Sequence, residues 1–266
     1  MQETKGQVIY FSHGGGPLPL LGDVSHRSMI SFMQELPSTL HTPEAIVVIS
    51  AHWEENIPTV LGAEHPSLLY DYYGFPKQAY EISYPAQGNP QLSKKIIEML
   101  DHAGISGKID EQRGFDHGLF VPLLMMYPKA NIPAIQLSLV KGLDAQTHIQ
   151  IGKALKDLLC ENVLIIGSGF SFHNMQAFTW SESRKDDKEN DAFQDWLIDV
   201  CTGLHSAEER EALLATWQQA PYARYCHPRE EHLLPLHICA SLAQCEASVI
   251  FDDHILGKRG IALKWL

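Results

Sequence analysis

Short apolar segments typical of buried β-strands alternate along this chain with longer segments that have the pattern of helices. Residues 8–12, 45–50 and 163–166 are almost wholly apolar. Strands that are buried on both faces have such sequences, and strands connected through helices are typical of parallel sheets. The alternation therefore predicts an α/β protein: a single three-layer domain over residues 1–266, with a central, mostly parallel or mixed sheet flanked by helices.

The same patterns predict the remaining elements. Further strands are expected at residues 58–61 (beside the strand at 45–50), 132–139, 248–251 and 261–265. Helices are expected at residues 28–40, 89–103, 144–159, 185–203, 207–220 and 229–242. Residues 62–88 are rich in tyrosine, proline and glycine, which predicts a long irregular loop. Inside a compact domain, a loop of that length is more often functional than idle.

The charge of the chain argues against two classes of partner. Among its 266 residues, 20 are Lys or Arg and 32 are Asp or Glu, so the formal net charge is −12. Nucleic acids and anionic membrane surfaces are bound by basic faces, so we expect no nucleic acid and no membrane partner. The five cysteines form no CxxC pair, and the N-terminal residues lack the features of a secretory signal. Together these features predict a cytoplasmic protein with reduced thiols.

Histidine follows each of the three most apolar strands. His13 comes directly after the first strand, His52 takes the same relative place after the second, and His173 stands a few residues beyond the third. In open α/β sheets, ligands bind beyond the carboxyl ends of the strands. The repeated placement predicts a shared metal or catalytic site, although any one of these histidines alone would be read as a hydrogen-bonded structural residue.

Two further motifs contain histidine. FDHGLFVPL contains His117, and CHPREEHLLPLH contains His227, His232 and His237. His232 stands at the start of a predicted helix, where its side chain can point into a site, whereas His237 lies deeper in the apolar run and is expected in the core. Three imidazoles from distant parts of a chain can hold a divalent ion and leave positions open, as in catalytic metal sites.

Two other features allow alternative interpretations. The triple glycine at residues 14–16 matches no phosphate-binding motif and predicts a turn that lets substrate or backbone approach closely. Trp53 is either ordinary packing or one wall of a pocket for an aromatic ligand.

The motifs SHGGGP, SAHWE, YGFP, FDHGLFVPL, GSGFSFHNM and HPREEHLLPLHI occur here in an order that resembles the class III extradiol ring-cleavage dioxygenases. The similarity is greatest to the 4,5-DOPA dioxygenase extradiol subgroup, and it covers nearly the whole chain. Met175 is a small departure, because leucine is common at that position.

The resemblance implies a non-haem Fe(II) site, which Zn(II) is also able to occupy. His13 and His52 would be ligands, and the third ligand would be His232 or the adjacent Glu231. His173 would be a catalytic base beside the metal and a fourth ligand when zinc fills the site.

The resemblance also implies the reaction and its substrates. His117 would be a second acid–base group for the cleavage by O2 of a catechol such as L-DOPA at its 4,5 bond. His227, Arg229 and Trp53 are expected to bind the substrate. The residues Tyr72, Tyr73 and Phe75 of the irregular loop either cover the ring or pack ordinarily. The chain is expected to be a monomer or a homodimer, and the alternative functions are a zinc-dependent hydrolase and a non-enzymatic binding protein.

Overall fold

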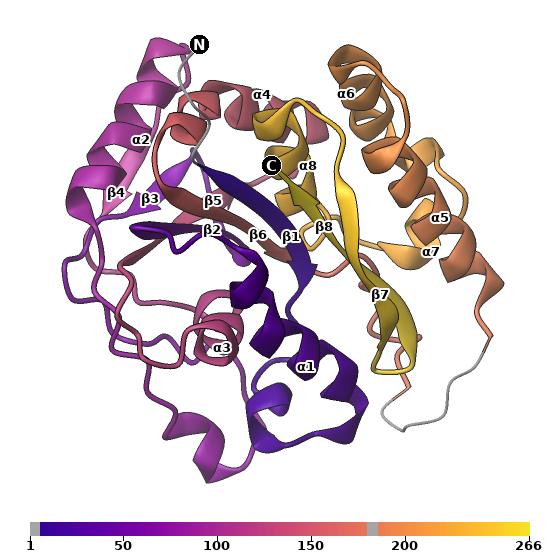
Figure 1. Cartoon of the computed structure of the whole chain (residues 1–266), viewed down its shortest axis with the longest axis horizontal. Helices are drawn as coiled ribbons and strands as arrows, with labels where there is room; N and C mark the ends of the chain where they lie inside the picture. The colour runs from indigo at the N-terminus through magenta and orange to yellow at the C-terminus, as the bar shows by residue number, and fades with distance from the viewer. Residues whose placement is uncertain (1–5, 180–185) are drawn as a thin grey trace.

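The computed structural model describes residues 6–179 and 186–266, and these residues contain one eight-stranded sheet (Figure 1). The strands in chain order are β1 (Gln7–Ser12), β2 (Ala45–Glu55), β3 (Thr59–Leu61), β4 (Lys108–Asp110), β5 (Ala134–Val140), β6 (Val163–Gly169), β7 (Ser248–Ile255) and β8 (Lys258–Trp265). Across the sheet they run in the order β4-β3-β5-β2-β6-β1-β8-β7. Two of the sequence predictions touch residues that lie outside the described ranges. They are residues 1–5, which contributed to the argument against a secretory signal, and Lys185, the first residue of a predicted helix.

The centre of the sheet is parallel and its edges are mixed. Strands β5, β2, β6 and β1 pair in parallel, while β8 is antiparallel to β1 and to β7. The predicted α/β class with a mixed, mostly parallel sheet is confirmed. The expected pairing of residues 58–61 with the second strand is wrong, because β5 lies between them and Val60 faces Leu137 of β5.

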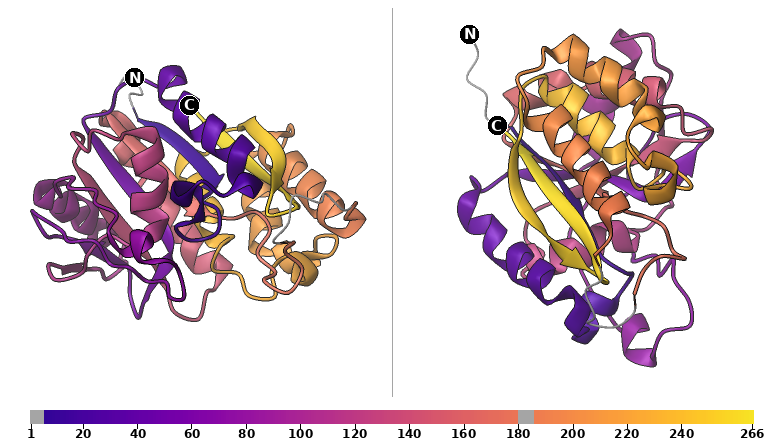
Figure 2. Two further views of the ribbon diagram at one scale, coloured as in Figure 1. Left: turned by 90° about the horizontal axis from the view of Figure 1, so that it is seen from below. Right: turned by 90° about the vertical axis from the view of Figure 1, so that its right-hand side faces the viewer.

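Helices cover both faces of the sheet. They are α1 (Arg27–Glu35), α2 (Pro90–His102), α3 (His117–Met126), α4 (Ala145–Ala154), α5 (Lys188–Thr202), α6 (Ala207–Ala215), α7 (Ala223–Cys226) and α8 (Leu234–Ala243). Helices α1 and α3 pack together on one face, and α4 and α8 pack together on the other. In the right-hand view of Figure 2, α1 lies on one side of the yellow β7–β8 hairpin and the orange α5 and α6 lie on the other. This double cover explains why the central strands are apolar throughout.

Helix boundaries follow local capping and proline. Asn89 and Asp144 cap α2 and α4 by accepting hydrogen bonds from the backbone N–H groups of Leu92 and Thr147. The helix expected from residue 229 begins only at Leu234, with Pro235 in its first turn, where proline fits best. His232 therefore lies in the turn before α8 and not on the helix itself.

The second strand is longer than expected, and this changes how His52 is presented. Strand β2 runs on to Glu55, but its pairing register with β5 shifts between Ile49 and Glu54. Such an irregularity redirects side chains at the end of a strand. His52 therefore projects from an irregular part of β2, whereas His13 lies just beyond the end of β1 as expected.

None of the described helices is long and apolar enough to cross a membrane.

Candidate metal centre

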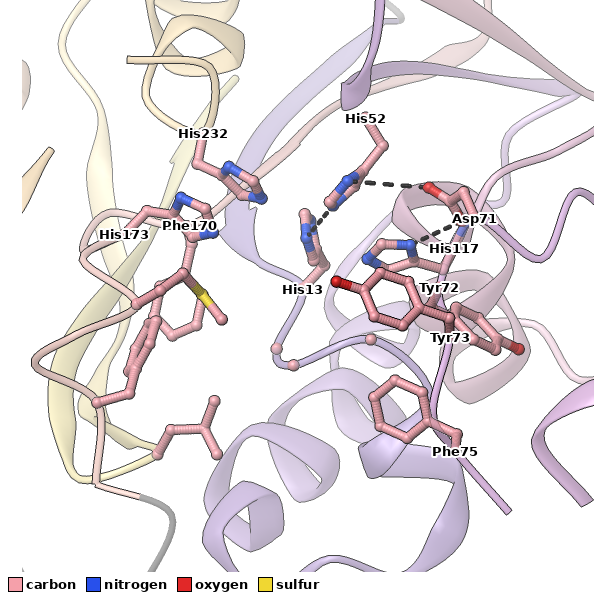
Figure 3. Close-up of a pocket in the computed structure, with 16 residues that line it drawn as sticks. His13, His52, Asp71, Tyr72, Tyr73, Phe75, His117, Phe170, His173 and His232 are labelled. Carbon is pink, nitrogen blue, oxygen red and sulfur yellow. Dashed lines mark hydrogen bonds and ion pairs between the residues drawn. The ribbon is translucent and has the colours of Figure 1, made fainter. Parts of the chain in front are cut away.

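Three histidines from distant parts of the chain meet beyond the carboxyl ends of the central strands. One ring nitrogen each from His13, His52 and His232 lies within 4.8 Å of the other two. The ring centroids are 4.8 Å apart for His13 and His52, and 5.3 and 4.9 Å from His232 to these two rings. Figure 3 shows the three imidazoles turned toward a common point. The strand-end placement predicted from the sequence thus brings His13 and His52 together, and His232 joins them from the turn before α8.

Hydrogen bonds fix which ring nitrogens are free. The Nδ1 of His13 lies 3.0 Å from the Ser168 hydroxyl, which donates its own hydrogen to the Gly118 carbonyl at 2.6 Å. His13 must therefore donate from Nδ1, and its Nε2 carries a lone pair. His52 has its Nδ1 3.8 Å from an Asp71 carboxylate oxygen, which favours the proton on that nitrogen.

The two Nε2 atoms of His13 and His52 are 2.9 Å apart. With both rings protonated at Nδ1, two lone pairs face each other at that distance, which is unfavourable unless a cation or a proton lies between or beside them. A divalent metal ion relieves this repulsion, and imidazole is its commonest protein ligand. The donor set therefore fits a metal ion.

Glu231 holds His232 and His173 through one oxygen. Its Oε1 is 3.0 Å from the Nδ1 of His232 and 3.0 Å from the Nδ1 of His173. These two imidazoles stack with centroids 3.4 Å apart and an interplanar angle of 18°. A carboxylate that accepts from Nδ1 leaves Nε2 for a ligand, which is the usual arrangement around metal-bound histidine. The geometry therefore favours His232 over Glu231 as the third donor, with Glu231 as its orienting partner.

His117 is held by Asp71 in a similar way. The backbone N–H and the Nδ1–H of His117, the first residue of α3, both donate to Oδ1 of Asp71, at 3.0 and 2.8 Å. Asp71 belongs to the irregular loop, which is tied to the segment before α3 by hydrogen bonds between Leu69 and Phe115 and between Phe115 and Ser67. The Nε2 of His117 is left free, and its ring lies 3.8 Å from that of His52 between centroids.

Glycine allows the backbone of the His232 turn to approach the sheet. The His232 carbonyl accepts hydrogen bonds from the Phe170 N–H at 3.1 Å and from the Tyr10 hydroxyl at 3.0 Å. A Cβ at Gly169 would lie 2.0 Å from that same carbonyl oxygen, so no other residue fits there without displacing the turn. Gly169 is therefore required for the third imidazole to reach the other two.

A cavity of about 400 Å³ opens beside the imidazoles. Its lining consists of the five histidines His13, His52, His117, His173 and His232 with Asp71, the three glycines 14–16, and Tyr72, Tyr73, Phe75, Phe170, Met175, Phe178 and Leu256. The loop residues Tyr72, Tyr73 and Phe75 thus do line the cavity. The volume is in the range of small-molecule sites.

Three residues expected at the substrate are placed differently. His227 is fully buried outside the lining of this cavity, 2.9 Å from the Ser171 carbonyl, and Trp53 is buried beneath Arg113. Arg229 lies in a shallow adjoining hollow and forms two 2.7 Å contacts with Glu54. The structure does not bring His227 and Trp53 to the cavity, and it pairs Arg229 with carboxylates of the protein.

Several residues that support the site were not predicted from the sequence. Asp71 and Ser168 orient His117 and His13. Ser168 stands within the motif GSGFSFHNM and Asp71 stands two residues before YGFP, but nothing else in the sequence marks them as partners of these histidines. The fully buried His26 accepts a hydrogen bond from the Gly15 N–H at 3.0 Å and contacts Asp23 at 2.8 Å, so it braces the triple-glycine turn. Gly14 and Gly16 in this turn have φ angles of 85° and 56°, which glycine adopts without strain.

Burial controls the protonation of the candidate ligands. It lowers the pKa of His13, His52 and His232 well below that of free imidazole, and neighbouring imidazoles lower it further. In Asp71 and Glu231, burial would raise the carboxyl pKa, but hydrogen bonds from His117 and His173 outweigh it and the pKa is lowered. The three imidazoles are therefore neutral, and the two carboxylates are ionised, at neutral pH.

Because His227 and His237 are also buried, we expect the free energy of unfolding of the metal-free protein to fall in acid. Burial lowers the pKa of His227 to about 3 and that of His237 to about 4. The unfolded chain binds protons near pH 6.5 and the folded one does not, so stability falls as pH drops below that value. We expect each of these two histidines to lower the free energy of unfolding by about 2 kcal/mol between pH 7 and pH 5.

Urea denaturation at the two pH values measures this loss, with His237→Gln as the comparison. The variant lacks one of these two histidines, so its loss of unfolding free energy between pH 7 and pH 5 should be smaller by about 2 kcal/mol. An equal loss in both proteins would show that His237 does not contribute.

Comparisons with known proteins show the family of this chain. The family described as the catalytic LigB subunit of aromatic ring-opening dioxygenase matches residues 22–260. The dioxygenase tasH of Hapsidospora irregularis is 38% identical over 266 residues, which cover 94% of this chain and 82% of that protein. The 4,5-DOPA dioxygenase extradiol of Portulaca grandiflora is 40% identical over 229 residues, covering 83% and 81% of the two chains. Its namesake from Escherichia coli K12 is 32% identical over 237 residues, covering 89% and 84%.

A solved structure shares the fold. The crystal structure of an uncharacterised protein from Escherichia coli K12 superposes with a TM-score of 0.78 at 27% identity, covering 97% of this chain and 98% of that chain. The family resemblance inferred from the motifs is confirmed, and it implies an aromatic substrate and O2. The chain belongs to the LigB family of class III extradiol dioxygenases and is an oxidoreductase that opens aromatic rings.

Proposed function

We propose that this chain is a single catalytic unit that uses Fe(II) and O2 to open the ring of a catechol, such as L-DOPA at its 4,5 bond. The observation that carries the proposal is the convergence of three imidazole nitrogens, two of them with facing lone pairs, at the end of a cavity of about 400 Å³. His13, His52 and His232 would hold the metal. L-DOPA is suggested by the names of relatives from Portulaca grandiflora and Escherichia coli.

The bound iron would supply open coordination positions for the two catechol oxygens and for O2, and would pass electron density between them. Zn(II) prefers the same imidazole donors but has no redox chemistry. We propose that His173 is an additional ligand when zinc fills the site, because it stacks on His232 and lines the same cavity.

His173 is proposed as the base that removes a proton from a catechol hydroxyl. Its Nδ1–H is held by Glu231, which leaves Nε2 as the acceptor, and its ring is part of the cavity wall. A carboxylate behind an imidazole stabilises the imidazolium that forms when Nε2 takes the proton.

His117 is proposed as the second acid–base group. Its Nδ1–H donates to Asp71, and its Nε2 is free to exchange a proton with the bound substrate during ring opening. His117 and His173 both line the cavity, and each is backed by its own carboxylate.

Family membership favours this function over the two alternatives. A zinc-dependent hydrolase would need the same imidazoles, but the matched family is described by ring-opening dioxygenation. A non-enzymatic binding protein would have no need of five histidines in one cavity, each held by a specific partner.

The variant His173→Phe tests the proposed base. It keeps the size and the stacking of the ring but removes the proton acceptor, so we expect metal binding to persist and ring opening to fall by about 10²–10⁴-fold. The protein is loaded anaerobically with Fe(II), a catechol is added in air-saturated buffer, and O2 uptake is followed with an electrode. Normal turnover by this variant would show that His173 is not the base.

A further inference from the structure

We propose that Asp116 is a positioning residue for the metal ligand His52, and that it acts through Ser50 and Arg113. This inference deepens the proposed function and rests on it, since it concerns how one of the proposed ligands is held. Asp116 directly precedes the proposed acid–base residue His117, but its own side chain is fully buried and is not among the residues that line the cavity.

The backbone at His52 is held by side chains as well as by the sheet. Pairing of β2 with β6 ends at Ser50, and its pairing with β5 shifts register between Ile49 and Glu54. The His52 N–H donates to the Ser50 hydroxyl at 3.2 Å, and the His52 carbonyl accepts from Nη2 of Arg113 at 3.3 Å. The direction in which the imidazole projects therefore depends on these two side chains.

Both of these side chains contact Asp116. The Ser50 hydroxyl donates to Oδ1 of Asp116 at 2.8 Å, and Nη2 of Arg113 donates to Oδ2 at 2.9 Å. Asp116 occupies the N-terminal cap position of α3, but among the described residues its side chain makes no hydrogen bond that caps this helix. A buried carboxylate is unfavourable unless it is paired, so its two oxygens keep both partners in place. One carboxylate thus fixes the hydroxyl and the guanidinium group that hold His52.

Trp53 fixes the orientation of Arg113. The indole is buried, and the guanidinium carbon of Arg113 lies 4.6 Å from the ring centroid. A planar guanidinium that stacks on an aromatic ring keeps its donors in a fixed direction. In this orientation one nitrogen, Nη2, reaches both Asp116 and the His52 carbonyl. A positioning role thus accounts for a tryptophan that is adjacent to His52 but does not line the cavity.

The first turn of α3 lies close against the same segment. A Cβ at Gly118 would lie 2.7 Å from the Ser50 hydroxyl oxygen and 3.2 Å from Cδ2 of the His52 ring. The rings of His52 and His117 are neighbours in Figure 3, with their centroids 3.8 Å apart. Asp116 therefore links a proposed metal ligand to the segment that carries the proposed acid–base residue.

Metal titration of variants tests the inference without turnover. The metal-free proteins are titrated with Co(II), whose visible absorption spectrum reports the geometry of its ligands. In Asp116→Asn the amide oxygen can still accept from Ser50, but the amide nitrogen faces a donor of Arg113, which disturbs the contact with His52. We expect Asp116→Asn and Arg113→Gln each to bind Co(II) about tenfold more weakly, with an altered spectrum, as when a partner that orients a ligand is lost.

A double-mutant cycle shows whether the two residues act together. If Asp116 acts on His52 through Arg113, the second change has little left to remove. The double variant should then bind Co(II) about tenfold, rather than about a hundredfold, more weakly than the wild-type protein. Ser50→Ala removes the other contact and leaves no charge unpaired, so it tests the inference even if the charge variants do not fold. We expect it to weaken Co(II) binding by about threefold to tenfold.

Arg210→Gln is the matched control. Arg210 is another buried arginine that donates to backbone carbonyls, those of Val200, Gly203 and His205, and it is not among the residues that line the cavity. We expect this variant to unfold at a lower urea concentration and to bind Co(II) with the affinity and the spectrum of the wild-type protein.

The outcomes separate the inference from the proposed function. If the wild-type protein binds one Co(II) per chain, and Asp116→Asn, Arg113→Gln and Ser50→Ala bind it equally well with the same spectrum, the inference is overturned and the proposed metal site stands. The inference is also overturned if the effects of the two charge variants multiply in the double variant, or if Arg210→Gln weakens binding as much as they do. If the wild-type protein binds no metal, the proposed function fails and the inference with it.

Discussion

Replacing either His13 or His52 by alanine is expected to abolish stoichiometric metal binding and, with it, ring opening. Each change removes one of two Nε2 donors that lie 2.9 Å apart, so only two of the three proposed imidazole ligands remain. Metal sites with three protein ligands and open positions lose most of their affinity when one ligand is lost. The cost in folding should be small for the metal-free protein, because removing one imidazole also removes the repulsion between the two facing lone pairs.

Titration of the metal-free proteins with Co(II) or Zn(II) measures the stoichiometry and affinity of metal binding directly and does not depend on turnover. The control is His102→Ala, because His102 is exposed at the end of α2 and is not among the residues that line the cavity. This variant should bind one metal ion with unchanged affinity. A His13 or His52 variant that still bound one ion per chain at wild-type affinity would contradict the assignment of that residue as a ligand.

The variants His232→Gln and Glu231→Gln are expected to differ sharply in metal affinity, although the two residues are adjacent. The first removes the third donor, so we expect stoichiometric metal to be lost. The second removes only the charge that holds the Nδ1–H groups of His232 and His173, both 3.0 Å from Glu231. Loss of such an orienting partner typically weakens metal affinity by about 10–100-fold.

The same metal titration distinguishes the two variants, and O2 uptake gives a second readout. Glu231→Gln should bind metal at raised concentration and show reduced turnover, because His173 loses its partner as well. If Glu231→Gln released the metal while His232→Gln retained it, Glu231 would be the third ligand and the site would be the two-histidine, one-carboxylate type.

Much of the site could be predicted because its parts follow strands. The apolar segments of β1, β2 and β6 can be recognised as strands from the sequence alone. The carboxyl ends of parallel strands meet at one edge of a sheet. His13 and His52 were therefore expected to meet. His232 could be named only from its motif, since its position depends on a turn that ends at Leu233 and on the close approach to Gly169.

The rest depends on contacts between residues far apart in sequence. His13 is oriented by Ser168, 155 residues away, and His117 by Asp71, 46 residues away. Neither partner is marked by periodicity or spacing. Trp53 and His227 were expected at the substrate but do not line the cavity. Both stand in conspicuous motifs, but a position in a motif does not determine whether a side chain faces the cavity or the core.

The central claim, that this chain inserts O2 into a catechol ring at the histidine cluster, is tested most directly with ¹⁸O₂. The protein is loaded anaerobically with Fe(II), mixed with 4-methylcatechol under ¹⁸O₂, and quenched with borohydride so that the aldehyde oxygen cannot exchange with water. The account predicts a ring-opened product that carries both heavy oxygen atoms, with one O2 consumed per catechol and no such product from the His13→Ala protein. An intact quinone, a product labelled only from water, or no O2 uptake by the iron-loaded protein would contradict it.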